Sequence, residues 1–222
     1  MKKWTTVDQA LAPDGQTISL HEHDGSYMIR VDGIPLMSTR QHASEEKLAE
    51  LACAHLRGTR GARVLIGGLG FGFTLRAALR AVGDGATVGV AEILSAVIAW
   101  NRNAAFRLAA DVLADPRVTV LQQDVGEAIR EGRGSFDAII LDVDNGPAAL
   151  STDGNRRLYN STGLRNARAA LRPGGRLALW SVAPDPAFER LMTRAGFRVE
   201  VQRCQSHVSS GRWHTLFIGL MQ

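Results

Sequence analysis

A glycine-rich segment constrains the fold of this chain more than any other feature. Residues 62–77 read ARVLIGGLGFGFTLRA, so a short apolar run leads into Gly67, Gly68, Gly70 and Gly72 and then into a segment with helical spacing. This order predicts a strand, a tight turn and a helix N-terminus, as in a nucleotide-binding βαβ unit. Glycine lets a backbone approach a ligand closely, but many α/β proteins carry such turns without a ligand. No Lys follows the last glycine, which excludes a P-loop.

Strand-like and helix-like segments alternate after this turn. We expect strands at 64–66, 87–91, 118–122, 136–141 and 176–180, and helices at 74–82, 94–102, 126–131, 163–171 and 186–195. Such alternation predicts an α/β, Rossmann-like, doubly wound and mostly parallel sheet. Two final strand-like runs, 197–203 and 215–220, have no helix between them. They complete a seven-stranded sheet as an antiparallel C-terminal hairpin at its edge.

The first 43 residues have a different sequence pattern from the rest of the chain. Residues 17–20 and 27–31 alternate in polarity around an Asp-Gly turn, which predicts a β-hairpin. A helix is expected over residues 44–56, with Ser44 as its N-cap and acids in its first turn. The chain therefore divides into a small N-terminal β appendage, residues 1–43, and an α/β domain, residues 44–222.

Composition excludes several classes of protein. The 222 residues carry 26 Lys and Arg against 22 Asp and Glu, spread without a dense basic run, so nucleic-acid binding is not expected. No apolar run approaches the length of a membrane span, and no signal-peptide core follows Met1. Cys53 and Cys204 lack CxxC spacing and are expected to be buried thiols in a reducing, cytoplasmic compartment. His21 and His23 share a strand face without a third ligand, so no metal is expected.

Acidic residues follow three successive strands of the predicted sheet, at the edge where such sheets bind ligands. Glu92 ends the second strand, about 20 residues past the glycines, where an acid can bind ribose hydroxyls. Asp124 follows the third strand and could accept from an adenine amino group, and Asp142 follows the fourth. Each acid alone could equally cap the next helix. Three in succession favour a nucleoside site.

The order of these segments resembles the spermidine synthases, the polyamine aminopropyltransferases of the class I S-adenosylmethionine-dependent methyltransferase superfamily. The matching segments are VLIGGLGFGFTLRAAL, VGVAEI, QQDVGEAI, FDAIILDVDNGP and LYNSTGLRNARAALRPGGRLALW. The resemblance spans about residues 32–220 and implies S-adenosylmethionine, or its decarboxylated form, as the cofactor. It implies cofactor contacts at Gly68, Gly70, Phe71, Gly72, Glu92, Ile93, Asp124, Val125 and Asp142. Together with the appendage it also indicates a homodimer.

The resemblance gives Asp142 a second role, because the aspartate at this position in the family binds and deprotonates the attacking amine. Asp142 could instead order the loop that follows it. Transfer from a sulfonium needs an aligned nucleophile, exclusion of water and a proton acceptor. Asp144 could assist Asp142 in attracting a cationic amine, and Tyr159 could orient it. Trp180 is either a further pocket residue or a core tryptophan.

One residue of the glycine turn departs from the family pattern. Phe71 stands where polyamine synthases carry an aspartate that binds the aminopropyl ammonium and repels a cofactor that retains its carboxylate. Plant putrescine N-methyltransferases resemble the chain here, since an apolar residue likewise replaces the acid. The family's glutamine and tyrosine before the first core strand are not evident, although Gln41 could be a displaced substitute.

Three functions remain open at this point. The favoured one is an S-adenosylmethionine-dependent transferase acting on a small amine acceptor, with methyl transfer preferred because of Phe71. The second is a true polyamine aminopropyltransferase with altered specificity. The third is a non-catalytic nucleoside-binding relative.

Overall fold

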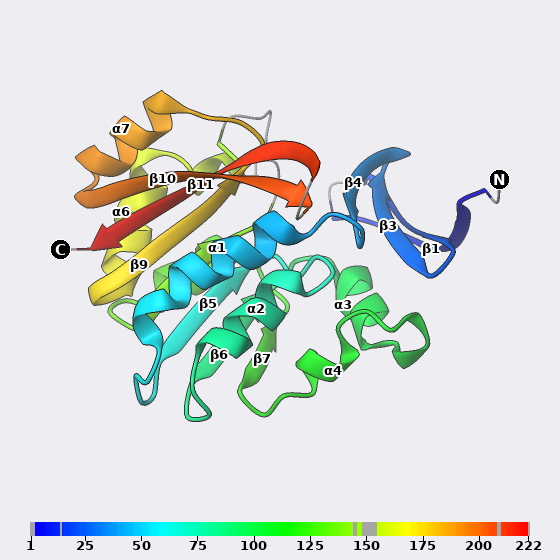
Figure 1. Ribbon diagram of the computed structural model, residues 1–222, viewed down its shortest axis with the longest axis horizontal. Coiled ribbons are helices and arrows are strands. Elements are labelled where there is room, and N and C mark those ends of the chain that lie inside the picture. Colours follow the sequence, from blue (N-terminus) through cyan, green and yellow to red (C-terminus); the bar gives the residue numbers. More distant parts are fainter. Residues whose placement is uncertain (1–2, 14, 144–145, 148–154, 208–209, 222) are drawn as a thin grey trace.

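The computed structural model describes residues 3–13, 15–143, 146–147, 155–207 and 210–221. These residues form a four-stranded sheet and a seven-stranded sheet, with the N-terminal strands at one end of the molecule (Figure 1). Within these ranges, no helix has the length and apolar character needed to cross a membrane.

The N-terminal sheet is an antiparallel meander in the order β1-β2-β3-β4. Its strands are β1 (Thr5–Leu11), β2 (Thr17–His23), β3 (Ser26–Val31) and β4 (Ile34–Ser38). The predicted hairpin is β2 and β3, joined by Asp24 and Gly25, which both have positive φ as a tight hairpin turn requires. Strand β1 was not predicted because its residues are almost all exposed and therefore lack the alternation of a half-buried strand.

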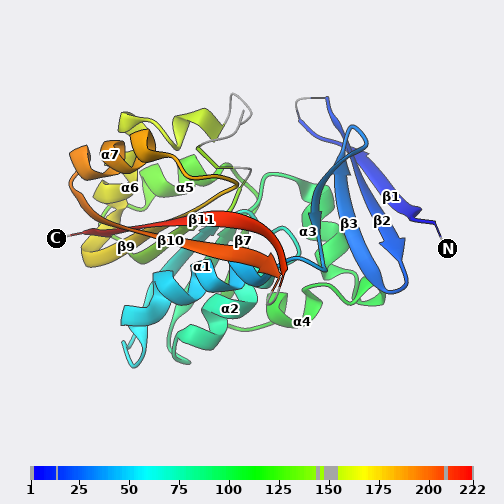
Figure 2. The ribbon, with the colours of Figure 1, turned by 45° about the horizontal axis from the view of Figure 1, so that its top comes forward.

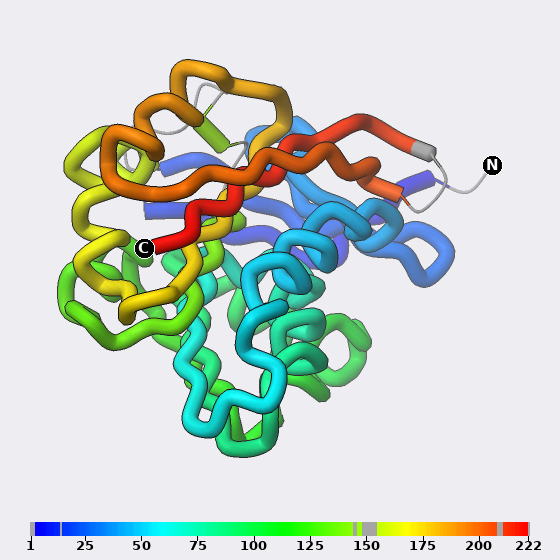
Figure 3. Tube along the Cα trace, turned by 60° about the vertical axis from the view of Figure 1, so that its left-hand side comes forward, coloured from blue at the N-terminus to red at the C-terminus, as the bar shows by residue number. Residues whose placement is uncertain are grey.

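The large sheet confirms the predicted Rossmann-like architecture, in the order β10-β11-β9-β8-β5-β6-β7. Its strands are β5 (Arg63–Gly67), β6 (Thr87–Ala91), β7 (Val118–Leu121), β8 (Phe136–Leu141), β9 (Leu171–Ser181), β10 (Phe197–His207) and β11 (Ser210–Met221). Strands β5 to β9 are parallel, and β11 is antiparallel to both β9 and β10. The C-terminal hairpin is therefore confirmed (Figure 3), but its antiparallel strand β11 lies one place inside the expected edge.

Helices cover both faces of this sheet, as Figure 2 shows. They are α1 (Ala43–Cys53), α2 (Phe73–Ala81), α3 (Ser95–Arg102), α4 (Ala110–Leu113), α5 (Val125–Glu131), α6 (Ser161–Ala170) and α7 (Pro186–Arg194). Short 3₁₀ turns lie at η1 (Ala54–Leu56), η2 (Ala104–Phe106) and η3 (Asn155–Arg157). The segments α4 and η2 were not predicted, because they are too short to show a helical period.

Two apolar cores follow from the alternation of side chains along the strands. Val64 and Ile66 of β5 enter a core with α1, α2 and α3, whereas Leu65 enters a core with α5, α6 and α7. Strand β8 divides its residues in the same way. The parallel strands are thus buried on both faces, which explains their nearly continuous apolar sequences.

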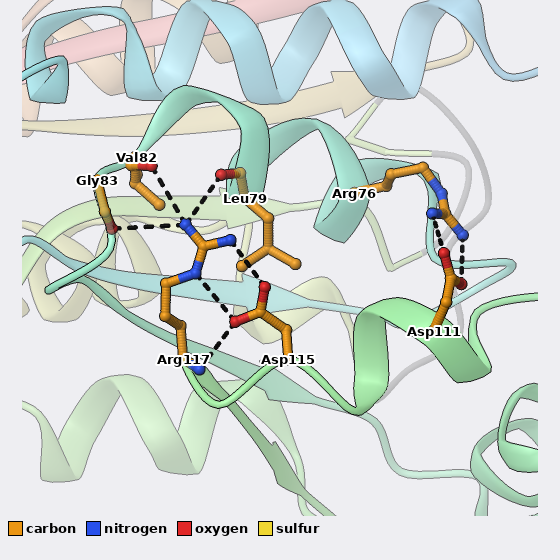
Figure 4. Close-up of polar contacts among 7 residues, drawn as sticks. All are labelled: Arg76, Leu79, Val82, Gly83, Asp111, Asp115 and Arg117. Atoms are coloured by element: carbon orange, nitrogen blue, oxygen red, sulfur yellow. Dashed lines mark hydrogen bonds and ion pairs between the residues drawn. The ribbon is translucent and has the colours of Figure 1, made fainter.

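An arginine near the start of β7 ties the end of α2 to the sheet (Figure 4). Arg117 Nη1 donates to the carbonyls of Leu79 at 3.2 Å and Val82 at 3.3 Å, which the last turn of a helix leaves unpaired. Asp115 holds the guanidinium through two further bonds, of 2.9 Å to Nε and 2.7 Å to Nη2. This contact fixes α2, whose N-terminus begins at the glycine turn.

Candidate active site

The glycine turn lies between β5 and α2, at the carboxyl edge of the sheet. Gly68 has φ +85°, and a Cβ there would lie 2.3 Å from the carbonyl oxygen of Asp142. Gly72 has φ +78°, and a Cβ there would lie 2.5 Å from Cβ of Ala109. These two glycines therefore allow the turn to pack against the protein itself, so their presence alone does not indicate a ligand.

Glu92 connects this turn to the start of α3. Its carboxylate accepts hydrogen bonds from the backbone N–H groups of Leu69 at 3.0 Å and Leu94 at 2.8 Å. The side chain is buried, and burial raises the pKa of Glu92 above its ordinary value. Each carboxylate oxygen has a second lone pair, so these bonds leave Glu92 able to accept from a ribose hydroxyl.

Three further residues predicted to contact the cofactor lie at neighbouring strand ends. Ile93 is 51% exposed, which is unusual for an isoleucine directly after a buried strand. Asp124 accepts a hydrogen bond from the N–H of Glu127 at 3.2 Å. It therefore caps α5, which was one of the two roles that the sequence allowed. Val125 is the first residue of α5 and is buried in the core. Contact of these residues with a cofactor stays a prediction.

A cavity of about 510 Å³ lies beside the glycine turn and is closed on one side by the N-terminal sheet. The turn contributes Leu69, Gly70 and Phe71 to its wall, and Asp142 lies at the end of β8. Met28 and residues 35–38 come from the N-terminal sheet, and Trp180 and His214 from β9 and β11. Gln41 lines it as well. Of the predicted site residues, Gly70, Phe71 and Asp142 are therefore brought together here.

Asp142 is held in place on this wall by two hydrogen bonds. The hydroxyl of Thr74, in the first turn of α2, donates to Oδ2 of Asp142 at 2.7 Å. The N–H of Asp142 donates to the carbonyl of Gly67 at 3.0 Å. The carboxylate is thus fixed beside the glycine turn by the same helix that the turn begins.

Another predicted catalytic residue, Tyr159, is not part of this wall. Tyr159 is buried in the core on the opposite face of the sheet, edge-on to Phe188 with ring centroids 6.0 Å apart. Asp144 lies outside the described residues. No cluster of three or more metal-ligating side chains occurs in the described part of the chain.

The structure adds a second acidic residue to the cavity, Glu45 in the first turn of α1. Burial first, and the nearby charge of Asp142 second, raise the pKa of Glu45 to about 8. The sequence signal was the Glu45-Glu46 pair, which the preference for acids at helix starts explains equally well. Only the fold brings Glu45 close to Asp142.

Ser44 does not cap α1 as expected. It lies inside the helix, fully buried, and His42 at the N-cap position makes no capping bond. Instead Ser44 Oγ lies 2.9 Å from Oε2 of Glu45, 2.9 Å from Nδ1 of His214 and 3.1 Å from Nε1 of Trp180. The Trp180 indole is half-buried, so it packs on the core and also lines the cavity.

Comparison with known proteins supports the fold but not a closer assignment. No protein-family model matches the chain, and no curated protein sequence matches it. Spermidine synthase from Thermotoga maritima superimposes with a TM-score of 0.74 at 19% identity, covering 98% of this chain and 73% of that one. A spermidine synthase in complex with the transition state analogue AdoDATO gives the same score and identity, with 98% and 72% covered.

A third solved structure, a probable spermidine synthase from Corynebacterium glutamicum, has a TM-score of 0.67 at 16% identity, with 99% of this chain and 81% of that chain covered. At these identities the likeness shows the fold alone. The chain therefore has a spermidine synthase-like fold.

Proposed function

We propose that this chain, with its spermidine synthase-like fold, is a transferase that uses S-adenosylmethionine or its decarboxylated form to alkylate a small amine. The observation that carries the proposal is the position of Asp142. Its carboxylate lies on the wall of a cavity beside the glycine turn and is fixed there by Thr74. A fixed carboxylate at this edge of the sheet can bind an ammonium group and accept its proton.

The residues present fit the cofactor. Gly70 lines the cavity, and a Cβ there would lie 3.3 Å from Sδ of Met37, so glycine lets the turn pack closely against β4. Glu92 retains acceptor capacity for ribose hydroxyls, and the exposed side chain of Ile93 offers an apolar surface for a planar base. Residues of the glycine turn would hold the amino-acid part. When bound, the cofactor supplies an electrophilic carbon next to a sulfonium.

The chain's own residues then have three tasks. An ammonium has no lone pair, so Asp142 must take a proton from the acceptor before the nitrogen can attack. The hydrogen bond from Thr74 to Oδ2 holds the Asp142 carboxylate in one orientation. Phe71, Phe73 and Trp180 line the cavity and exclude water from the reacting atoms.

We favour methyl transfer because of Phe71. This side chain is 6% exposed and packs on the core while lining the cavity, so it presents no charge to the cofactor. A carboxylate at this position would attract an aminopropyl ammonium and repel a carboxylate-bearing cofactor, and Phe71 does neither. Aminopropyl transfer is the second candidate, since solved structures that share this fold are spermidine synthases.

Calorimetry with both forms of the cofactor separates these candidates. Methyl transfer predicts tighter binding of S-adenosylmethionine, and a clear preference for the decarboxylated form would overturn it. The variant Phe71→Asp should shift the preference toward the decarboxylated form. Asp142→Asn should retain cofactor binding and lose turnover with an amine panel. Binding without turnover in the unmodified chain would instead indicate a non-catalytic nucleoside-binding protein.

A further inference from the structure

Glu45 has no part in the chemistry described so far, yet it shares the cavity with Asp142. The two residues come from separate elements, since Glu45 lies in α1 and Asp142 follows β8. Two nearby carboxyl groups with little water around them resist ionising together. A cation between them removes that conflict.

Two cationic side chains, Arg40 and Arg212, line the same cavity, but neither forms an ion pair with Glu45. The titratable or charged groups that line the cavity with it or interact with it are Arg40, Glu46, Asp142, Cys204, Arg212 and His214. Arg40 instead binds Ser26 at 2.9 Å and His23 at 3.1 Å. Glu46 bonds outward to Arg80 at 3.5 Å. Within the described ranges, no cationic side chain forms an ion pair with Glu45.

Ser44 connects Glu45 to His214 in a hydrogen-bond chain, Glu45–Ser44–His214. The Ser44 hydroxyl has one hydrogen and two lone pairs. The N–H of Trp180 can only donate, so it uses one lone pair at 3.1 Å. The remaining hydrogen and lone pair must serve Glu45 and His214, both at 2.9 Å.

Hydrogen bonds along Glu45–Ser44–His214 can therefore be donated in either of two directions. When Glu45 is ionised, Ser44 donates to it and His214 donates from Nδ1 to Ser44. When Glu45 is protonated on Oε2, it donates to Ser44, and Ser44 donates to an unprotonated Nδ1 of His214. The second arrangement needs a neutral imidazole, and burial lowers the pKa of His214. The ring tautomer therefore reports where the Glu45 proton is.

We propose that Glu45 is a second acceptor-binding carboxyl, which holds a proton in the ligand-free protein and releases it to solvent when an ammonium group enters beside Asp142. The hydrogen-bond chain reverses as the proton leaves. No covalent bond other than the O–H of Glu45 breaks, and the carboxylate that forms pairs with the incoming charge. The ammonium as ligand rests on the proposed function, whereas the proton on Glu45 does not.

The ligand-free half is tested by NMR, with ¹³C observation of the Glu45 carboxyl and ¹⁵N observation of the His214 ring between pH 5.5 and 9.5. The carboxyl should titrate near pH 8, and the His214 tautomer should change with the same midpoint. Asp142→Asn should lower that midpoint, and Glu45→Gln should abolish the tautomer change. Titration of Glu45 below about pH 6, as for an ordinary carboxyl, or a pH-independent His214 tautomer would overturn the proposal.

The ligand half is tested by calorimetry with 1,4-diaminobutane at pH 7, in two buffers of different ionisation enthalpy. The unmodified chain should release a proton on binding. Glu45→Gln should bind about tenfold more weakly and release none, since a charge-assisted contact is lost. The control is Glu46→Gln, from the same helical turn but outside the cavity wall, which should release the proton normally. Absence of diamine binding, or binding without proton release, would overturn this half.

The role proposed for Glu45 and the proposed transferase function can be refuted independently. The NMR titration needs no cofactor and no turnover, so its result stands even if the chain transfers neither a methyl nor an aminopropyl group. Conversely, an active transferase in which Glu45 titrates normally would keep the proposed function and lose the proton-sharing role.

Discussion

Substitution of Gly68 by alanine tests how the glycine turn and Asp142 are connected. The backbone of Gly68 has φ +85°, and its missing Cβ would lie 2.3 Å from the carbonyl oxygen of Asp142. That atom belongs to backbone, which cannot rotate away as a side chain can. The strand end that carries Asp142 must therefore move when Gly68 becomes alanine.

The expected loss of stability has two sources. An alanine in the left-handed region costs about 1–2 kcal/mol. Forcing a packed contact apart costs about 1–3 kcal/mol more, because atoms this close must separate by about 0.7 Å to reach even the shortest contact that real Cβ atoms make. Together these give a decrease of about 2–5 kcal/mol in the free energy of unfolding, a large part of a typical total.

Urea unfolding followed by circular dichroism measures this loss. Gly83→Ala is the matched control, since a Cβ there meets no atom within 4 Å and its φ is not in the left-handed region. That variant should stay within about 1 kcal/mol of the parent. Gly68→Ala should also weaken amine binding, because the Thr74 hydroxyl and Asp142 no longer meet at 2.7 Å. Equal stability of the two variants would show that the turn does not pack against Asp142 as described.

Three further outcomes follow from the structure. Arg117→Met should lower stability by about 1–2 kcal/mol in urea unfolding at pH 7, because carbonyls at the end of α2 lose their donor. The hydrogen bond from Arg117 lowers the pKa of Asp115 to about 2, so the separate contribution of the Asp115–Arg117 pair should be complete above about pH 4 and be lost as the pH falls through 2. Asn101→Leu should lower thermal stability, since Nδ2 donates at 2.8 Å to the carbonyl of Gly70. Glu45→Gln should match the parent's stability at pH 4 and exceed it by up to about 5 kcal/mol at pH 9. Folding raises the Glu45 pKa from 4.5 to about 8. The parent's folded state is therefore progressively destabilised as the pH rises from 4.5 through 8, whereas the neutral Gln side chain does not titrate.

Much of the fold and part of the site could be predicted from sequence. The apolar runs of β5 and β8 and the glycine turn between β5 and α2 are local patterns, and topology places Glu92, Asp124 and Asp142 at one edge of the sheet. The catalytic role predicted for Tyr159 was not supported by its position. Tyr159 follows a long loop, and the sequence does not reveal on which face of the sheet the chain continues after such a loop. Tyr159 lies in the core beside Phe188.

Contacts between distant segments could not be predicted. Ser44 and His214 are 170 positions apart, and neither has a neighbour in sequence that suggests the other. The N-cap prediction for Ser44 was wrong for the same reason. A buried hydroxyl inside a helix looks like a capping hydroxyl near its start until the partners from β9 and β11 are known.

The inner position of β11 also affects how the site forms during folding. This strand is synthesised after every other strand of the sheet, yet it inserts between β9 and β10, with Thr215 paired to Ser181. Closing contacts over such long sequence separations is slow. His214 reaches the cavity only when β11 has docked, so the cavity wall is incomplete in a nascent chain whose earlier strands have already paired. The site is therefore assembled late, as the last step of building the sheet.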